Sequence, residues 1–172
     1  MCELRCETSR LSLIPASFEE MAYMLMEGQR VVLPSALDDI MRTAIATKIG
    51  TMRAVPKETY PWFTYWKILR KKELAGGTIG KECAIGLICC KGLPDEEGYT
   101  ELGYRMSKEM RRQGYMKEAI LGLLDWLYEF PFCRGAYVRI RRENEASIQT
   151  VCSCGFVYEK EKDGYQIYRY TF

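Results

Sequence analysis

The strongest structural signal in the sequence is a strand, a long amphipathic helix and a second strand in direct succession. Residues 99–106 (YTELGYRM) and residues 136–141 (AYVRIR) each predict a β-strand. Between them, apolar residues recur at helical spacing from Met116 to Phe130, and Pro131 ends the pattern. Two strands joined through such a helix predict a right-handed parallel crossover over residues 100–142.

The rest of the chain adds elements on both sides of this unit. Ser17 and Glu20 form a capping box for a helix that Gly28 can end. The other predicted elements are a short strand at 11–15, one helix or a broken pair over 35–55, strands at 62–72 and 82–92 joined by a hairpin loop, a helix that Asn144 caps and Gly155 ends, and a C-terminal hairpin around 162–164. The order β-α-α-β-β-β-α-β-α-β-β predicts an α/β fold with a mixed sheet, in a single domain over residues 1–172.

Composition excludes several classes of chemistry. The 172 residues include no histidine, which excludes Ser-His-Asp triads, Cys–His pairs and histidine-containing metal sites. The eight cysteines contain no CxxC pair, so we expect small buried residues of a reducing compartment and no metal. The net charge is only +2, and no apolar run approaches membrane-spanning length. We therefore expect a cytoplasmic protein without nucleic-acid or membrane partners.

A basic loop that contains a glycine joins the 99–106 strand to the long helix. Its cations outnumber its carboxylates, with Arg105, Lys108, Arg111, Arg112 and Lys117 against Glu109 and Glu118. A helix N-terminus offers unpaired N–H groups and the positive end of the helix dipole, and Gly114 lets a ligand approach the backbone closely. The loop therefore fits a pyrophosphate group. A capped helix with a solvated, charged start accounts for the same residues.

The same loop resembles the signature of a known family. Arg111-Arg112-Gln113-Gly114-Tyr115-Met116 is similar to the R/Q-x-x-G-x-G/A sequence of the GNAT superfamily of acyl-CoA-dependent N-acyltransferases. Further segments resemble, in the same order, the branch that contains the ribosomal-protein N-terminal (alanine/serine) acetyltransferases: Thr8-Ser9-Arg10-Leu11, Glu101-Leu102-Gly103-Tyr104, Glu118-Ala119, Asn144-Glu145-Ala146-Ser147 and Gly155-Phe156. The resemblance spans essentially the whole chain. It departs at Met116, where the family has a small residue.

The resemblance implies a mostly antiparallel central sheet, with helices on both faces and with fourth and fifth strands that splay apart around acetyl-CoA. The pantetheine arm would pair with the fourth strand at Tyr104, Arg105 and Met106 and would contact Asn144. The pyrophosphate would meet the loop residues Arg111, Arg112, Gln113, Gly114, Tyr115 and Met116. The acetyl group would pass directly, in a ternary complex, to a primary amine of a protein N-terminus or a small molecule.

Three residues follow as catalytic candidates. Glu101 is either the base that takes the proton of the amine or an edge carboxylate paired with an arginine. Glu159 matches the glutamate of G-F-x-x-E that serves as the base in part of the branch, or it is a solvated strand residue. Ser147 would donate a proton to the leaving thiolate or bind it, although satisfying a helix-start N–H is a common role for serine. A tyrosine hydroxyl is an alternative donor.

Other functions stay open at this point. A catalytically degenerate member would bind acyl-CoA or serve in regulation, and a nucleic-acid-binding domain would use the basic cluster at 105–117, which fits poorly with the near-neutral charge. The identity of the amine acceptor and the oligomeric state do not follow from the sequence. A homodimer formed through the C-terminal strands or helices is one option.

Overall fold

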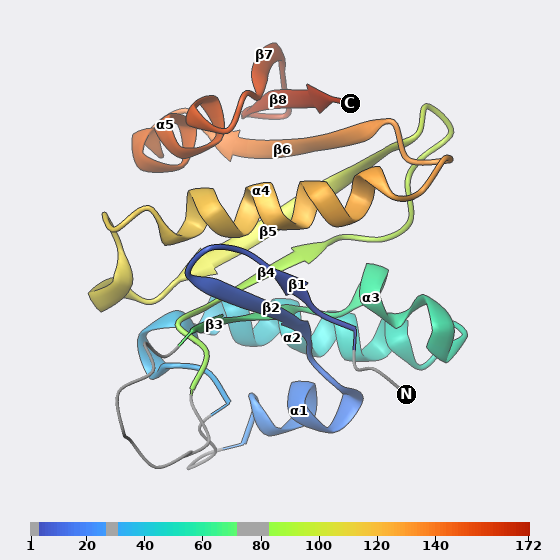
Figure 1. Ribbon diagram of the computed structural model, residues 1–172, viewed down its shortest axis with the longest axis vertical. Helices are drawn as coiled ribbons and strands as arrows, with labels where there is room; N and C mark the ends of the chain where they lie inside the picture. Colours follow the sequence, from blue (N-terminus) through green and yellow to red (C-terminus); the bar gives the residue numbers. More distant parts are fainter. Residues whose placement is uncertain (1–3, 27–30, 72–82) are drawn as a thin grey trace.

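The computed structural model describes residues 4–26, 31–71 and 83–172 (Figure 1). One sheet runs through these residues in the order β1-β2-β3-β4-β5-β6-β8-β7. Neighbouring strands are antiparallel except β5 and β6, which are parallel. The strands are β1 (Cys6–Glu7), β2 (Leu11–Pro15), β3 (Trp66–Arg70), β4 (Gly86–Cys90), β5 (Tyr99–Met106), β6 (Gly135–Arg141), β7 (Val157–Lys162) and β8 (Tyr165–Thr171). The predicted α/β class with a mixed, mostly antiparallel sheet is confirmed.

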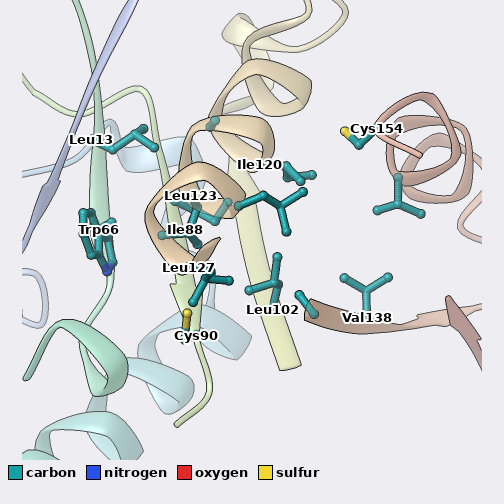
Figure 2. Packing of buried hydrophobic residues seen from close by; sticks show 14 of the residues in the cluster. Leu13, Trp66, Ile88, Cys90, Leu102, Ile120, Leu123, Leu127, Val138 and Cys154 are labelled. Atoms are coloured by element: carbon teal, nitrogen blue, oxygen red, sulfur yellow. The ribbon is translucent and has the colours of Figure 1, made fainter. Parts of the chain in front are cut away.

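Helices cover both faces of the sheet. They are α1 (Phe18–Tyr23), α2 (Asp39–Met52), α3 (Tyr60–Phe63), α4 (Tyr115–Tyr128) and α5 (Glu145–Ser153). A hydrophobic cluster on one face joins α4 and α5 to the sheet, and Figure 2 shows Leu123 of α4 beside Ile88 of β4. A second cluster joins α1 and α2 to the other face, through residues such as Ile45 and Leu87. Neighbouring residues of a strand point to opposite faces of the sheet. Since helices cover both faces at β4, every residue of this strand is buried.

Caps set the points at which several helices begin. The Ser17 hydroxyl accepts the Glu20 N–H and the Glu20 carboxylate accepts the Ser17 N–H, which is the predicted capping box. Asp38 caps α2, and Asn144 caps α5 as predicted. No side chain of the described residues caps α4, which begins after Gly114, whose φ is +77°. The first N–H groups of α4 therefore remain available to a ligand.

The strands β5 and β6 separate along their length. They pair only over Tyr99–Gly135, Thr100–Ala136 and Glu101–Tyr137, although β5 continues to Met106 and β6 to Arg141. Helix α4 connects them, so the predicted parallel crossover is confirmed (Figure 1). Because β1 is an additional short strand, β5 and β6 correspond to the fourth and fifth strands of the expected fold. Their divergence opens the sheet at one end.

Some predicted boundaries are wrong. Helix α1 ends at Tyr23 with Met24 as its C-cap, so it is shorter than predicted. Gly28 and residues 73–82, where the hairpin loop was predicted, lie outside the described residues. Strand β3 begins at Trp66, because residues 60–63 form α3 with Pro61 in its first turn, where a missing N–H costs nothing. In α3, Trp62 packs on Trp126, with ring centroids 4.8 Å apart. Tertiary packing there overrides the strand preference of aromatic residues.

The described cysteines are free thiols, and the expected burial holds for Cys89, Cys90, Cys133 and Cys154. It does not hold for Cys152, which is exposed, or for Cys6 and Cys83, which are half-buried. Cys89 lies in the cluster against α1 and α2, and Cys90 lies in the cluster against α4. Cys83 precedes β4. Within residues 4–26, 31–71 and 83–172 no cluster of carboxylates and thiols is arranged to hold a metal ion. Among the helices described there, none is both long and apolar enough to cross a bilayer.

Candidate functional site

A cleft of about 980 Å³ opens where β5 leaves β6, between the start of α4 and one face of α5. The cleft brings together almost all of the residues predicted to bind a cofactor, from three separate segments. They are Tyr104, Arg105 and Met106 of β5; Arg111, Arg112, Gly114, Tyr115 and Met116 of the loop and α4; and Asn144 before α5. The predicted proton donor Ser147 also lines it. Gln113 does not, because its side-chain amide donates to the Glu109 carbonyl at 3.2 Å.

The cleft is electropositive. Arg105, Arg111, Arg112 and Lys117 line it, and Glu145 is the one carboxylate among the described residues that line it, although Arg105 also pairs with Asp38. Burial, and then the charge of Arg111, lower the pKa of Arg105. The uncapped N-terminus of α4 adds its dipole and its free N–H groups to these cations. An anionic group is therefore favoured at this end of the cleft.

The loop before α4 has an unusual backbone. Arg112 has a φ of +60° and Gly114 a φ of +77°, so two of three consecutive residues are left-handed. Arginine rarely adopts this conformation, which costs about 1–2 kcal/mol. Such strain persists only where the surroundings hold it, and it is concentrated at ligand-binding sites. The backbone of this loop is therefore built for close approach to a ligand.

We expect Gly114→Ala to lower the free energy of unfolding by about 1 kcal/mol and to weaken binding of an anionic ligand. An alanine at this position would have to keep the φ of +77°, and its Cβ would lie 3.4 Å from a terminal guanidinium nitrogen of Arg10. Thermal unfolding should show a loss of about 2–4 °C. Gly50→Ala is the matched control, because its added Cβ meets open space in α2 and should leave stability unchanged or raised. Equal stability and ligand affinity of the Gly114→Ala protein and the wild type would contradict this reading.

The main chain of β5 offers hydrogen bonds to the gap. Toward β4, the Glu101 carbonyl accepts the Lys91 N–H at 2.8 Å, and the Ser107 N–H donates to Ile85 at 3.0 Å. Because main-chain groups alternate in direction along a strand, Tyr104 and Met106 direct theirs away from β4. Strand β6 does not pair with them beyond Glu101, and the Met106 carbonyl instead accepts the Arg111 Nε at 3.2 Å, which leaves the Met106 N–H and the main-chain groups of Tyr104 facing the gap. An extended ligand arm can take the place of β6.

A buried hydroxyl lies beside Ser147 in the cleft. The Tyr104 hydroxyl makes no well-formed hydrogen bond within the described part of the chain. Burial raises the pKa of Tyr104 to about 12, and the neighbouring Ser147 hydroxyl opposes part of this rise. The Ser147 N–H is held at 3.3 Å by the Asn144 side chain, so Asn144, not the serine hydroxyl, provides the cap. Both side chains line the cleft, where their hydroxyls can reach a ligand.

The two candidate bases lie in a second cleft, of about 390 Å³, whose lining does not overlap that of the first. Glu101 is buried there, and one of its oxygens contacts Lys91 at 2.5 Å and Arg139 at 3.0 Å. The contact with Arg139 agrees with one of the two alternatives that the sequence left open for Glu101, a carboxylate paired with an arginine. Glu159 occupies a bulge where the register between β7 and β8 shifts, and it contacts Arg169 at 3.1 Å. Bulges often re-aim a side chain beside an active site.

Sequence reasoning missed one wall of the first cleft. Ala146, Gln149, Thr150 and Ser153 of α5 line it together with Ser147. They recur at spacings of three and four residues, so they share one helix face, opposite the buried Val151. That spacing of small and polar residues was the available signal. Because such a face is also typical of simple solvent exposure, the spacing alone does not predict a cleft.

The first cleft fits acetyl-CoA. The cations and the free N–H groups of α4 suit a diphosphate, and the unpaired edge of β5 suits the amides of pantetheine. The unpartnered Tyr104 hydroxyl lies where a further polar group would satisfy it. These features belong to this chain and do not depend on any relative.

Comparison with known proteins gives matches over most of the chain. Residues 18–157 match the family described as acetyltransferase (GNAT) domain. An uncharacterized N-acetyltransferase of Bacillus subtilis, YjdG, is 30% identical over 111 residues, which are 63% of this chain and 60% of that protein. The match thus spans less than two thirds of this relative.

Solved structures share the fold. The ribosomal-protein-S5-alanine acetyltransferase of Vibrio fischeri superposes with a TM-score of 0.69 at 14% identity, covering 98% of this chain and 97% of that one. RimL, a ribosomal L7/L12 α-N-protein acetyltransferase in complex with coenzyme A, superposes with a TM-score of 0.66 at 14% identity, covering 98% of each chain. At these identities the likeness establishes the fold alone.

Proposed function

Because the chain belongs to the GNAT family of acetyltransferases, whose members are acetyl-CoA-dependent N-acetyltransferases, we propose that it transfers an acetyl group directly from acetyl-CoA to a primary amine in a ternary complex. One observation carries this proposal: β5 and β6 pair over three residues and then diverge, so that a cationic cleft lies at the start of α4. The anion-binding residues line the first cleft, and the candidate bases line the second, where the acceptor amine would bind.

Residues of the first cleft would hold the cosubstrate. The N–H groups at the start of α4, with Arg111 and Arg112, would bind the diphosphate, and Tyr104 and Met106 would bond the pantetheine arm through their main chains. Asn144 would contact the same arm while it caps α5. When bound, acetyl-CoA supplies the acetyl group and a thiolate leaving group.

The acceptor amine attacks as a free base, so a carboxylate must take its proton. We assign this role to Glu159. One oxygen of Glu101, whose side chain is 8% exposed, contacts Lys91 at 2.5 Å and Arg139 at 3.0 Å. One oxygen of Glu159, whose side chain is 29% exposed, has the longer contacts, with Arg169 at 3.1 Å and Lys160 at 3.7 Å, and Arg169 also pairs with Glu97. Glu159 is therefore less firmly engaged, and Glu101 would serve to compensate the two cations beside the acceptor.

Three groups of the first cleft would complete the transfer. The Met106 N–H, which points into the gap, would donate to the carbonyl oxygen as negative charge develops there. Tyr104 and Ser147 would deliver a proton to the departing sulfur, so that the carbon–sulfur bond breaks as the carbon–nitrogen bond forms. Because the pKa of Tyr104 is raised to about 12, its proton is present throughout the physiological range. The products are an N-acetylated amine and free coenzyme A.

The acceptor class is proposed as a peptide N-terminus, since two structures that share the fold carry the names of ribosomal-protein N-terminal acetyltransferases. The test is release of free thiol from acetyl-CoA with a panel of peptides, amino acids, polyamines and aminoglycosides, read out by mass spectrometry of the acceptors. We expect acetylation of at least one peptide α-amine. Binding of acetyl-CoA without any acetylated acceptor would indicate a binding domain and not an enzyme.

A further inference from the structure

The turn between β1 and β2 holds the first turns of α4. The Thr8 hydroxyl donates to one carboxylate oxygen of Glu118 at 2.6 Å, and the Arg10 main-chain N–H donates to the same oxygen at 2.6 Å. The Arg10 side-chain Nε donates to the other oxygen at 2.7 Å. The Glu118 side chain is only 17% exposed. These residues are 108 positions or more apart in the chain, so the contact is a tertiary one.

Arg10 also reaches the loop that precedes the helix. A terminal nitrogen of its guanidinium donates to the Gln113 carbonyl at 3.0 Å, directly before Gly114. The guanidinium also lies over the Tyr115 ring, 4.5 Å from the centroid. One side chain thus contacts the residues on both sides of the left-handed Gly114. This geometry holds the strained segment from outside the cleft.

Glu118 is suited to anchor this arrangement. Burial acts to raise its pKa, but the hydrogen bonds from Thr8 and from the main chain and side chain of Arg10 outweigh burial and lower it. The carboxylate is therefore ionised while it is largely removed from solvent, with charged and neutral donors on both oxygens. Such a multiply bonded pair is more rigid than an exposed ion pair, whose contribution is small.

We propose that Arg10 and Glu118 form a clasp that fixes loop 111–116 in the conformation that binds the diphosphate of acetyl-CoA. The inference rests on the proposed function, because it assigns a ligand to the loop. Arg10 is then a positioning residue. If the loop without the clasp holds the binding conformation about a tenth of the time, the apparent Kd for acetyl-CoA rises about 10-fold.

The test compares two acetyl donors by calorimetry: acetyl-CoA, and S-acetylpantetheine, which has the same thioester and arm without the diphosphate. Arg10→Ala and Glu118→Gln should each raise the Kd for acetyl-CoA about 10-fold and that for S-acetylpantetheine less than about 2-fold, with the double variant little worse than either single one. Arg142→Ala, which removes an exposed ion pair with Glu161, is the control and should change neither Kd.

An equal loss of affinity for acetyl-CoA and S-acetylpantetheine would show that the clasp contributes only to the general stability of the fold, and it would contradict the proposal. If the Kd for acetyl-CoA rose in Arg10→Ala but stayed unchanged in Glu118→Gln, Arg10 would bind the phosphate directly, and the clasp would be refuted.

Hydrogen exchange in the ligand-free protein separates this inference from the proposed function. Arg10→Ala should accelerate amide exchange in residues 111–116 while β6 and β8 keep the wild-type rates. Unchanged exchange in the loop would refute the clasp whatever the protein binds. A wild-type protein that fails to bind acetyl-CoA would instead refute the proposed function, and loop exchange would still decide the clasp.

Discussion

Replacing Glu159 with glutamine is expected to lower kcat by about 10²–10⁴-fold, the range found for removal of a general base. The substitution keeps the shape of the side chain and removes its ability to accept a proton. Since Glu159 lines the second cleft and not the first, the Kd for acetyl-CoA should stay within about 2-fold of the wild-type value. Initial rates with the best acceptor of the panel, together with calorimetry, measure both quantities.

Two companion variants sharpen this prediction. Glu161→Gln makes the same chemical change on the same strand, but Glu161 does not line the second cleft, so kcat should be nearly unchanged. Glu101→Gln leaves Lys91 and Arg139 without their shared carboxylate, so we expect a lower free energy of unfolding. Full turnover in Glu159→Gln, with turnover lost in a folded Glu101→Gln protein, would transfer the role of base to Glu101. Full turnover in both would contradict a carboxylate base.

Tyr104→Phe and Ser147→Ala should each lower kcat by about 10²-fold, and the double variant should fall little further. Non-additivity is expected because the two hydroxyls are neighbours and deliver one proton to one sulfur atom. Tyr128→Phe, at an exposed tyrosine near the far end of α4, is the control and should keep full activity. Steady-state rates at saturating acetyl-CoA measure the effect.

The pH profile gives an independent check on the same pair. Burial places the pKa of Tyr104 at about 12, above the ordinary value of about 10. The folded enzyme therefore keeps this proton until the pH rises toward 12, and kcat should show no alkaline decline from Tyr104 below about pH 11. A decline centred near pH 10 that disappears in Tyr104→Phe would show that the phenol titrates normally. In the separate mutational test, additive losses of kcat in the Tyr104→Phe, Ser147→Ala double variant would show that the two hydroxyls act separately.

The sequence predicts the framework of the site well because its signals are local. Strand β5 occupies residues 99–106, as predicted, and the apolar spacing that begins at Met116 locates α4. The resemblance of residues 111–116 to a known loop predicts a ligand-binding segment, and the cleft brings those residues together except Gln113. Strand alternation and helical periodicity are properties of short stretches of sequence. They can therefore be read without knowing the tertiary contacts of those stretches.

Contacts between distant segments could not be predicted in the same way. The partners of Glu101 are Lys91, from the segment after β4, and Arg139 of β6, and only the sheet register brings them to one carboxylate. Thr8-Ser9-Arg10-Leu11 and Glu118-Ala119 are recognisable as separate motifs, but nothing in either shows that they bind each other. The helix over Tyr60–Phe63 was missed because its stability comes from packing on Trp126. Each failure concerns a tertiary contact.

The most direct test of the account is thermal unfolding of the wild-type protein with increasing acetyl-CoA. A ligand at 100 times its Kd stabilises the folded state by about 2.7 kcal/mol, which corresponds to a rise in Tm of about 5–10 °C for a chain of this size. We predict such a rise for the wild type and its loss in an Arg111→Glu, Arg112→Glu double variant, in which two cations of the cleft are reversed. No shift in the wild type at millimolar acetyl-CoA, or an equal shift in the double variant, would contradict the assignment of this cleft.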